Sequence, residues 1–213
     1  MKNLKIFNTP DEIRTYIQNR KIKLIGYGVE GYAYLDRNNA VLKEAREGYA
    51  LPYDNTIIFS NEFNLETFIF PDEVYIADDI VYGYKTKYFP NDVFCDIYRE
   101  NAVEIDLLKL IKAKNKAIED IKEITELGYA IDDLVGNVLF DGEKLALIDT
   151  LCYVKDYYTS VSKNIDKLNK ALDYKLAKID PLTSEWNMPF DNKINLLMRK
   201  NKSNKVLVKP LDI

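Results

Sequence analysis

The strongest constraint on the fold is a change in the pattern of apolar residues at Phe89-Pro90-Asn91-Asp92. Before this stretch, short segments with strand character predominate, with one helix among them. After it, apolar residues recur mainly at three- and four-residue steps, which is typical of amphipathic helices. We therefore expect an α+β protein of 213 residues, folded as one domain (1–213) with an antiparallel-sheet lobe in 1–88 and a reduced helical lobe in 89–213.

The first part of the chain begins with a predicted helix at 9–20. Thr9 is a suitable N-cap and Pro10 fits the first helical position. The segments expected to follow are strands at 21–25, 32–36 and 40–44, a helix at 57–69, and strands at 74–77 and 80–88.

The second part is expected to be mainly helical. The predicted elements are helices at 102–127, 155–177 and 190–200, with a hairpin at 138–140 and 145–148. Asp141-Gly142 supplies the turn of that hairpin.

Composition excludes several functions. The chain has no histidine, which removes Ser-His-Asp catalysis and the commonest zinc ligand. A net charge of -4 argues against a general nucleic-acid binder. No apolar run approaches the length of a membrane span, and the first residues lack the apolar core of a signal peptide. We therefore expect a cytoplasmic protein without membrane or nucleic-acid partners; the alternative location is outside the cell, as a secreted effector.

Three of the eight glycines fall in one hexapeptide, at Gly26, Gly28 and Gly31. In a dinucleotide-binding fold a helix would follow Gly31, whereas the residues that follow here have strand character. A glycine turn between two antiparallel strands allows backbone N–H groups to close over phosphates. The alternative is a glycine-rich hairpin that serves only to bend the chain.

Lys43 lies in an apolar strand just after this turn, and strand alternation places it on the same face as Val41. If this face is inward, the ammonium needs anionic partners. Glu62 and Glu66 are candidates from the following predicted helix, and Glu62 leaves more room before Pro71. The alternative is a lysine that points into solvent.

Asp132, Asn137 and Asp149 follow the longest predicted helix. Asn137 and Asp149 flank one hairpin at the same end, so both can point at one site. Amide and carboxylate oxygens suit Mg²⁺. Asp132 can orient a hydroxyl nucleophile and accept its proton. The alternative is that these side chains cap turns and a strand end.

The order of these features resembles the protein-kinase-like superfamily over about residues 22–155. The matching segments are GYGVEGYAY, VLK, DDLVGN and LIDT. The resemblance implies a two-lobed kinase-like fold. It also implies an enzyme that uses ATP and Mg²⁺ as cofactors.

Residue by residue, the resemblance implies roles for the nucleotide first. Gly26, Gly28 and Gly31 would cover the phosphates. Lys43 would hold the α- and β-phosphates and pair with Glu62, and the backbone near Lys87 and Tyr88 would receive adenine.

For the chemistry, the resemblance makes Asp132 the catalytic base and makes Asn137 and Asp149 the metal ligands. The chain also departs from the family. Ala130-Ile131 replaces the usual His-Arg, and Leu134 replaces the catalytic-loop lysine.

Three functions follow from these features. The first is a minimal protein kinase for Ser, Thr or possibly Tyr hydroxyls, with a protein as substrate. The second is a small-molecule kinase of the aminoglycoside or choline type, which the run from Gly136 to Leu139 also resembles. The third is a non-catalytic pseudokinase, against which the retained set of Lys43, Asp132, Asn137 and Asp149 argues.

Overall fold

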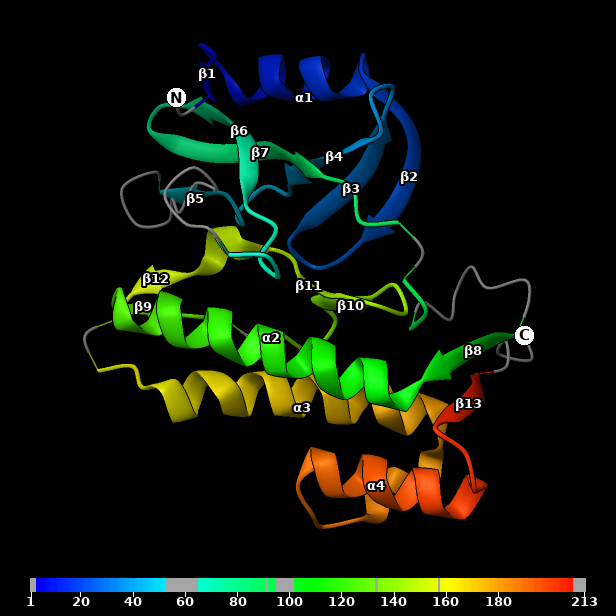
Figure 1. The fold of residues 1–213 in the computed structure, drawn as a ribbon. Coiled ribbons are helices and arrows are strands. Elements are labelled where there is room, and N and C mark those ends of the chain that lie inside the picture. Colours follow the sequence, from blue (N-terminus) through cyan, green and yellow to red (C-terminus); the bar gives the residue numbers. More distant parts are fainter. Residues whose placement is uncertain are drawn as a thin grey trace. The chain divides into compact units, whose positions relative to one another are not determined.

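The computed structural model describes residues 3–52, 65–90, 92–94, 102–132, 134–156 and 158–208 (Figure 1). These residues form an α+β protein in two compact units. The sheet unit comprises Met1–Leu65, Ile69–Tyr88 and Asp149–Lys155, and the helical unit comprises Glu66–Phe68, Phe89–Ile148 and Asp156–Ile213. None of the helices in the described part of the chain combines the length and the apolar character that crossing a membrane requires.

The sheet unit is built on a seven-stranded sheet. Its strands are β1 (Asn3–Ile6), β2 (Lys21–Tyr27), β3 (Gly31–Asp36), β4 (Ala40–Ala45), β5 (Leu51–Pro52), β6 (Pro71–Ala77) and β7 (Ile80–Lys87). The order is β1-β6-β7-β4-β3-β2, with β5 paired to β7. All pairs are antiparallel except β1 with β6. The unit also contains the short elements η3 (Thr150–Cys152) and β12 (Val154–Lys155).

Helix α1 (Pro10–Gln18) covers one face of this sheet (Figure 1). The Thr9 side chain accepts a hydrogen bond from the Glu12 N–H and caps the helix, as the sequence predicts. Ile13 and Ile17 are fully buried and form a core cluster with Leu42 of β4. The stripe of apolar residues on α1 therefore fixes which face of the sheet becomes the core.

Two turns join neighbouring strands that the sequence predicts, and Asp residues shape both of them. Between β3 and β4, the Asp36 carboxylate accepts hydrogen bonds from the N–H groups of Asn38 and Ala40. Between β6 and β7, Asp78 and Asp79 have φ angles of 50° and 58°. Such left-handed pairs form the tight turns that match the twist of antiparallel strands.

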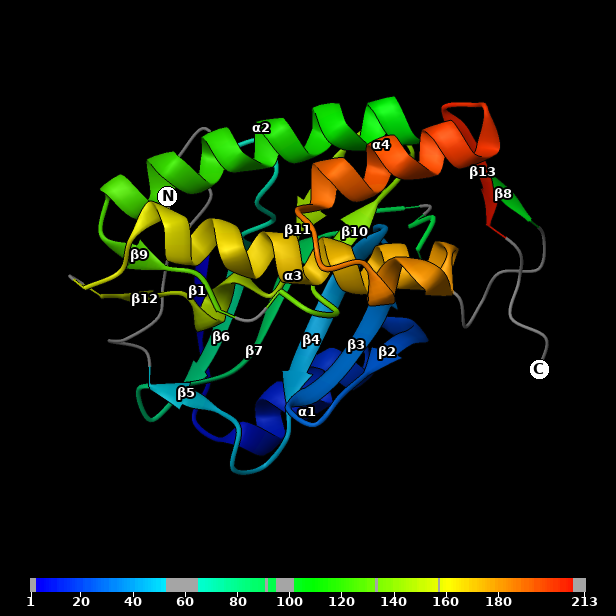
Figure 2. The ribbon, with the colours of Figure 1, turned by 90° about the horizontal axis from the view of Figure 1, so that it is seen from below.

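The helical unit contains three long helices. They are α2 (Leu107–Glu126), α3 (Val161–Ile179) and α4 (Phe190–Asn201). Helices α2 and α3 lie side by side (Figures 1 and 2). The other elements are β8 (Val103–Asp106), β9 (Tyr129–Ala130), β10 (Val138–Phe140), β11 (Leu145–Leu147), η4 (Pro181–Glu185) and β13 (Lys205–Val208). The predicted hairpin is present as β10 and β11.

The start of the predicted helix 102–127 is wrong. Val103–Asp106 instead pairs with β13 as a strand. The helix begins at Leu107, after the Asp106 side chain has accepted hydrogen bonds from the N–H groups of Leu108 and Lys109. Pairing with a segment about a hundred residues away thus overrides the local helical pattern.

Two further predicted helices differ from the structure. The helix predicted at 155–177 begins only at Val161, where the Ser160 side chain caps it. Most of the helix predicted at 57–69, including Glu62, lies outside the described residues, but residues 65–69 are not helical. In that stretch the backbone N–H and the hydroxyl of Thr67 both donate to the Asp120 carboxylate of α2.

The core role of β4 predicts a large effect of Leu42→Ala. Leu42 is fully buried, so its removal leaves a cavity under α1, and we expect a loss of about 2–5 kcal/mol in the free energy of unfolding. The matched control is Ile22→Ala on β2, because Ile22 is 62% exposed; we expect a loss below about 1 kcal/mol. Urea denaturation measures both, and equal losses would contradict the assignment of the core face.

Candidate functional site

An ion pair between Lys43 and Asp149 forms the centre of the candidate site. The Lys43 Nζ lies 2.5 Å from the Asp149 Oδ2, and the two side chains are 24% and 19% exposed. The Tyr84 hydroxyl donates a hydrogen bond of 2.6 Å to the other carboxylate oxygen of Asp149. Both oxygens of one carboxylate are therefore bound within the sheet unit.

The sheet register explains why these side chains meet. Burial alternates along β4, so Leu42 points into the core under α1 and Lys43 points to the other face, together with Val41. Lys43 is paired with Tyr84 of β7, and directly opposite residues carry their side chains on the same face. The predicted grouping of Val41 and Lys43 on one face is confirmed.

The same row of the sheet carries very small residues on the other side of Lys43. Lys43 is paired with Ala33 of β3, which is paired in turn with Gly26 of β2. A Cβ atom added to Gly26 would lie 3.7 Å from the Ala33 Cβ, so both residues occupy one face. Beside the ammonium, this row therefore presents backbone and a single methyl group.

The three glycines near this row differ in their surroundings. The N–H of Gly28 donates a hydrogen bond of 2.9 Å to the Gly31 carbonyl, which closes the turn between β2 and β3. A Cβ on Gly31 would lie 2.2 Å from the backbone oxygen of Glu44, whereas a Cβ on Gly28 would meet nothing within 4 Å. Strand β3, not a helix, follows Gly31, so the arrangement of a dinucleotide-binding turn is absent here.

The segment around Asp149 is anchored in the sheet unit by the residues that follow it. Leu151 packs in a buried cluster with Val74 and Tyr84, and the Thr150 hydroxyl donates to the Ile69 carbonyl. Asp149 itself has a φ of 65°, a conformation that is uncommon for residues other than glycine. Backbone strain of this kind occurs often at functional positions, where the surrounding contacts maintain it.

In the helical unit, the β10–β11 hairpin positions Asn137. The Asn137 carbonyl accepts a hydrogen bond of 2.9 Å from the Ile148 N–H, and Asp149 is the next residue in the chain. The Asn137 N–H donates to the Leu134 carbonyl and closes the preceding turn. The sequence expectation that Asn137 and Asp149 flank the same end of one hairpin agrees with this pairing.

The remaining predicted site residues are placed as follows. Asp132 is exposed in the loop after β9. Lys87 ends β7 opposite Ala40, and Tyr88 follows it outside the strand. Glu62, the predicted partner of Lys43, lies outside the described residues. Among the described residues, the carboxylate that pairs with Lys43 is Asp149.

The sequence reasoning missed two residues of α3 that bind the chain just before Asp132. Asn164 is fully buried, and its Oδ1 accepts a hydrogen bond of 3.2 Å from the Ile131 N–H. Its Nδ2 donates to the Thr125 hydroxyl and the Tyr129 carbonyl. The Lys167 ammonium donates to the Ile131 carbonyl.

A sequence signal for Asn164 exists in hindsight. It falls in the apolar period of α3, and the other members of the buried set on that helix are Leu168, Ala171, Leu172, Lys175 and Leu176. An amide at such a position needs hydrogen-bond partners in the interior. Here those partners hold the loop that leads to Asp132.

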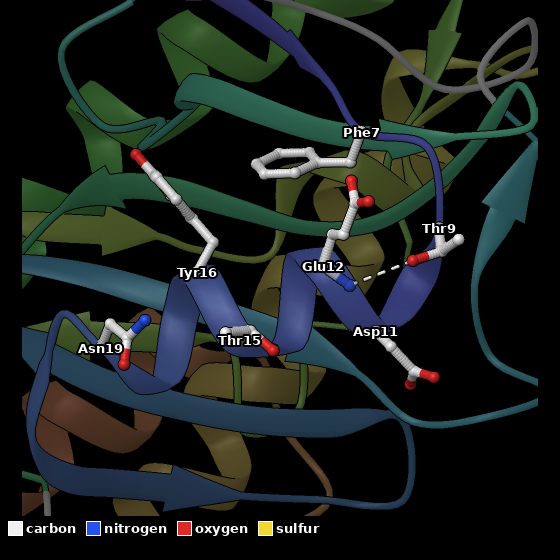
Figure 3. Close-up of a pocket in the computed structure, with 7 residues that line it drawn as sticks. All are labelled: Phe7, Thr9, Asp11, Glu12, Thr15, Tyr16 and Asn19. Carbon is white, nitrogen blue, oxygen red and sulfur yellow. Dashed lines mark hydrogen bonds between the residues drawn. The ribbon is translucent and has the colours of Figure 1, made fainter.

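A separate, shallow pocket lies in the sheet unit along α1 and the residues before it (Figure 3). Its lining is Phe7, Thr9, Asp11, Glu12, Thr15, Tyr16 and Asn19. None of these is a predicted site residue, and α1 covers the sheet face opposite to that of Lys43. The candidate site is therefore the Lys43–Asp149 pair and not this pocket.

Comparisons with known proteins add no identity. A scan of protein-family models and a search of curated proteins both found no match to this chain. Within the described ranges, no three or more Cys, Asp or Glu side chains lie together as a metal-binding group. A functional assignment therefore rests on the geometry of the residues above.

The glycine turn generates a prediction with an internal control. Gly31→Ala places a methyl group against the backbone of Glu44, so we expect overpacking to cost about 1–3 kcal/mol in the free energy of unfolding. Gly28→Ala meets no neighbouring atom and should change stability by less than about 1 kcal/mol. Thermal or urea denaturation of both variants checks this. A larger loss for Gly28→Ala than for Gly31→Ala would show that the turn has a different packing.

Proposed function

We propose that this chain is an ATP- and Mg²⁺-dependent phosphotransferase with a two-lobed, protein-kinase-like fold. The acceptor that we propose is a Ser or Thr hydroxyl of a protein. The observation that carries the proposal is the ion pair of Lys43 and Asp149, on the sheet face that also carries Gly26 and Ala33.

The ion pair supports a ligand-binding role better than a purely structural one. Partly buried ion pairs contribute little to stability, because the desolvation of both charges offsets their attraction. The half-buried Lys43 ammonium suits phosphate oxygens, and the Asp149 carboxylate suits the metal ion that accompanies a triphosphate. A bound nucleotide with its metal ion could replace the direct contact between Lys43 and Asp149, so that the ammonium binds phosphate and the carboxylate binds the metal.

Within the sheet unit, the proposal assigns the nucleotide to the glycine turn and Lys43. The backbone of Gly26, Gly28 and Gly31 would cover the phosphates, and Lys43 would bind the α- and β-phosphates. The backbone at Lys87 and Tyr88 would receive the adenine at the end of β7. Glu62 stays a prediction as a second partner of Lys43.

Two residues would hold magnesium. The Asn137 side-chain oxygen and the Asp149 carboxylate are hard donors, and two protein ligands suit an ion that keeps waters and phosphate oxygens in its shell. When bound, Mg²⁺ neutralises charge on the phosphates. Asn137 and the residue before Asp149 are joined by a backbone hydrogen bond, which supports their assignment to one site.

Asp132 would act on the acceptor. Its carboxylate accepts the hydroxyl proton while the hydroxyl oxygen forms a bond to the γ-phosphorus. The bond between the γ-phosphorus and the oxygen that bridges to the β-phosphate breaks, and ADP leaves with the electron pair. The exposure of Asp132 in the loop after β9 is compatible with access by a protein substrate.

The proposal predicts that Lys43→Met and Asp149→Asn each lower phosphoryl transfer at least about 100-fold, because each removes a charge that contacts the phosphates or the metal. Matched controls are Lys23→Met on β2 and Asp79→Asn in the β6–β7 turn, which change the same charges at exposed positions and should retain the wild-type rate. The measurement uses γ-labelled ATP with Mg²⁺ and dephosphorylated casein, and a chelator should abolish transfer.

The same assay separates the alternatives. Label on casein or on the chain itself supports the protein acceptor. Label found only on an aminoglycoside or choline would replace that acceptor with a small molecule. Binding of ATP without transfer to any acceptor would favour the pseudokinase and overturn the enzymatic proposal.

A further inference from the structure

The loop that contains Asp132 lacks a positive charge of its own. Leu134 stands two residues after Asp132, and it is fully buried, so this position adds only apolar packing. Phosphoryl transfer develops negative charge on the transferred group, and catalysis depends on fixed charges that stabilise it. If the proposed function holds, a positive charge held near this loop would add to the charges of Lys43 and the metal ion.

Helix α3 of the same unit places a lysine beside this loop. Lys167 donates a hydrogen bond to the carbonyl of Ile131, the residue immediately before Asp132. Asn164, three residues earlier on the same helix, accepts from the N–H of Ile131. Both backbone polar groups of Ile131 are thus bound by one face of α3, and the Lys167 ammonium is held at the residue that precedes Asp132 in the chain.

The charge of Lys167 is unusual in its setting. The side chain is half-buried, and within the described residues no carboxylate lies at ion-pair distance from its ammonium. By contrast, Lys114 pairs with Asp191, and Lys193 pairs with Asp173, in the same unit. A carbonyl oxygen compensates a partly desolvated ammonium only in part, so Lys167 retains capacity for an anion.

We propose that Lys167 supplies the positive charge beside Asp132 that stabilises the phosphoryl group during transfer, in place of the lysine that the loop lacks. The inference rests on the proposed function. The reaction would then need the charge of Lys167 and not only its hydrogen bond to Ile131.

Two substitutions separate charge from hydrogen bonding. Lys167→Gln keeps an N–H donor for the Ile131 carbonyl and removes the charge, whereas Lys167→Arg keeps both. Lys170→Gln is the matched control, because Lys170 is an exposed lysine on the same helix. The assay measures kcat and the KM for ATP with dephosphorylated casein, and urea denaturation reports the folding of each variant.

We expect Lys167→Gln to lower kcat about 100-fold with an unchanged KM for ATP, since the charge acts on the transition state. Lys167→Arg should stay within about tenfold of wild type, and Lys170→Gln should equal it. A Lys167→Gln variant as fast as Lys170→Gln overturns the inference. A folded Lys167→Arg variant as slow as Lys167→Gln also overturns it, because the charge alone would then not suffice.

The failure of this inference is distinguishable from the failure of the proposed function. An inactive wild-type chain refutes the phosphotransferase proposal, and this inference falls with it. An active wild-type chain with an unaffected Lys167→Gln variant refutes the role of Lys167 alone.

Discussion

The ion pair between Lys43 and Asp149 is the interaction on which the functional account depends. A half-buried ammonium on a sheet face needs an anionic partner, and the chain provides one from a segment more than a hundred residues later. The register of β4 with β7 brings Tyr84 to the same carboxylate. Leu151 then anchors the segment through the apolar cluster beside Tyr84. The packing of Leu151 and Tyr84 in the core thus helps to hold the Asp149 carboxylate beside Lys43.

Much of the sheet unit could be predicted from local sequence signals. Three such signals involve residues that are close in sequence: the cap at Thr9, the polar turn after Asp36 and the alternation around Lys43. In these places, local propensity and hydrogen bonding determine the structure. The strand period alone predicts that Lys43 and Val41 lie on the same face. Its partner was harder to predict, because Glu62 and Glu66 were the candidates from the sequence and only the tertiary fold brings Asp149 to Lys43.

Sequence reasoning missed three features that depend on contacts between distant segments. Strand β8 exists because β13 pairs with it, and its sequence alone reads as the start of a helix. Asn164 and Lys167 bind the Ile131 backbone because α3 lies against this part of the chain, which the local sequence does not show. Side chains from α3 thus hold the backbone of the loop before Asp132.

A crystal structure of the chain with a non-hydrolysable ATP analogue and Mg²⁺ tests the central claim most directly. We expect a phosphate oxygen within hydrogen-bond distance of the Lys43 Nζ and the metal ion on the Asp149 carboxylate. A nucleotide bound elsewhere, with Lys43 and Asp149 still paired only to each other, would contradict it.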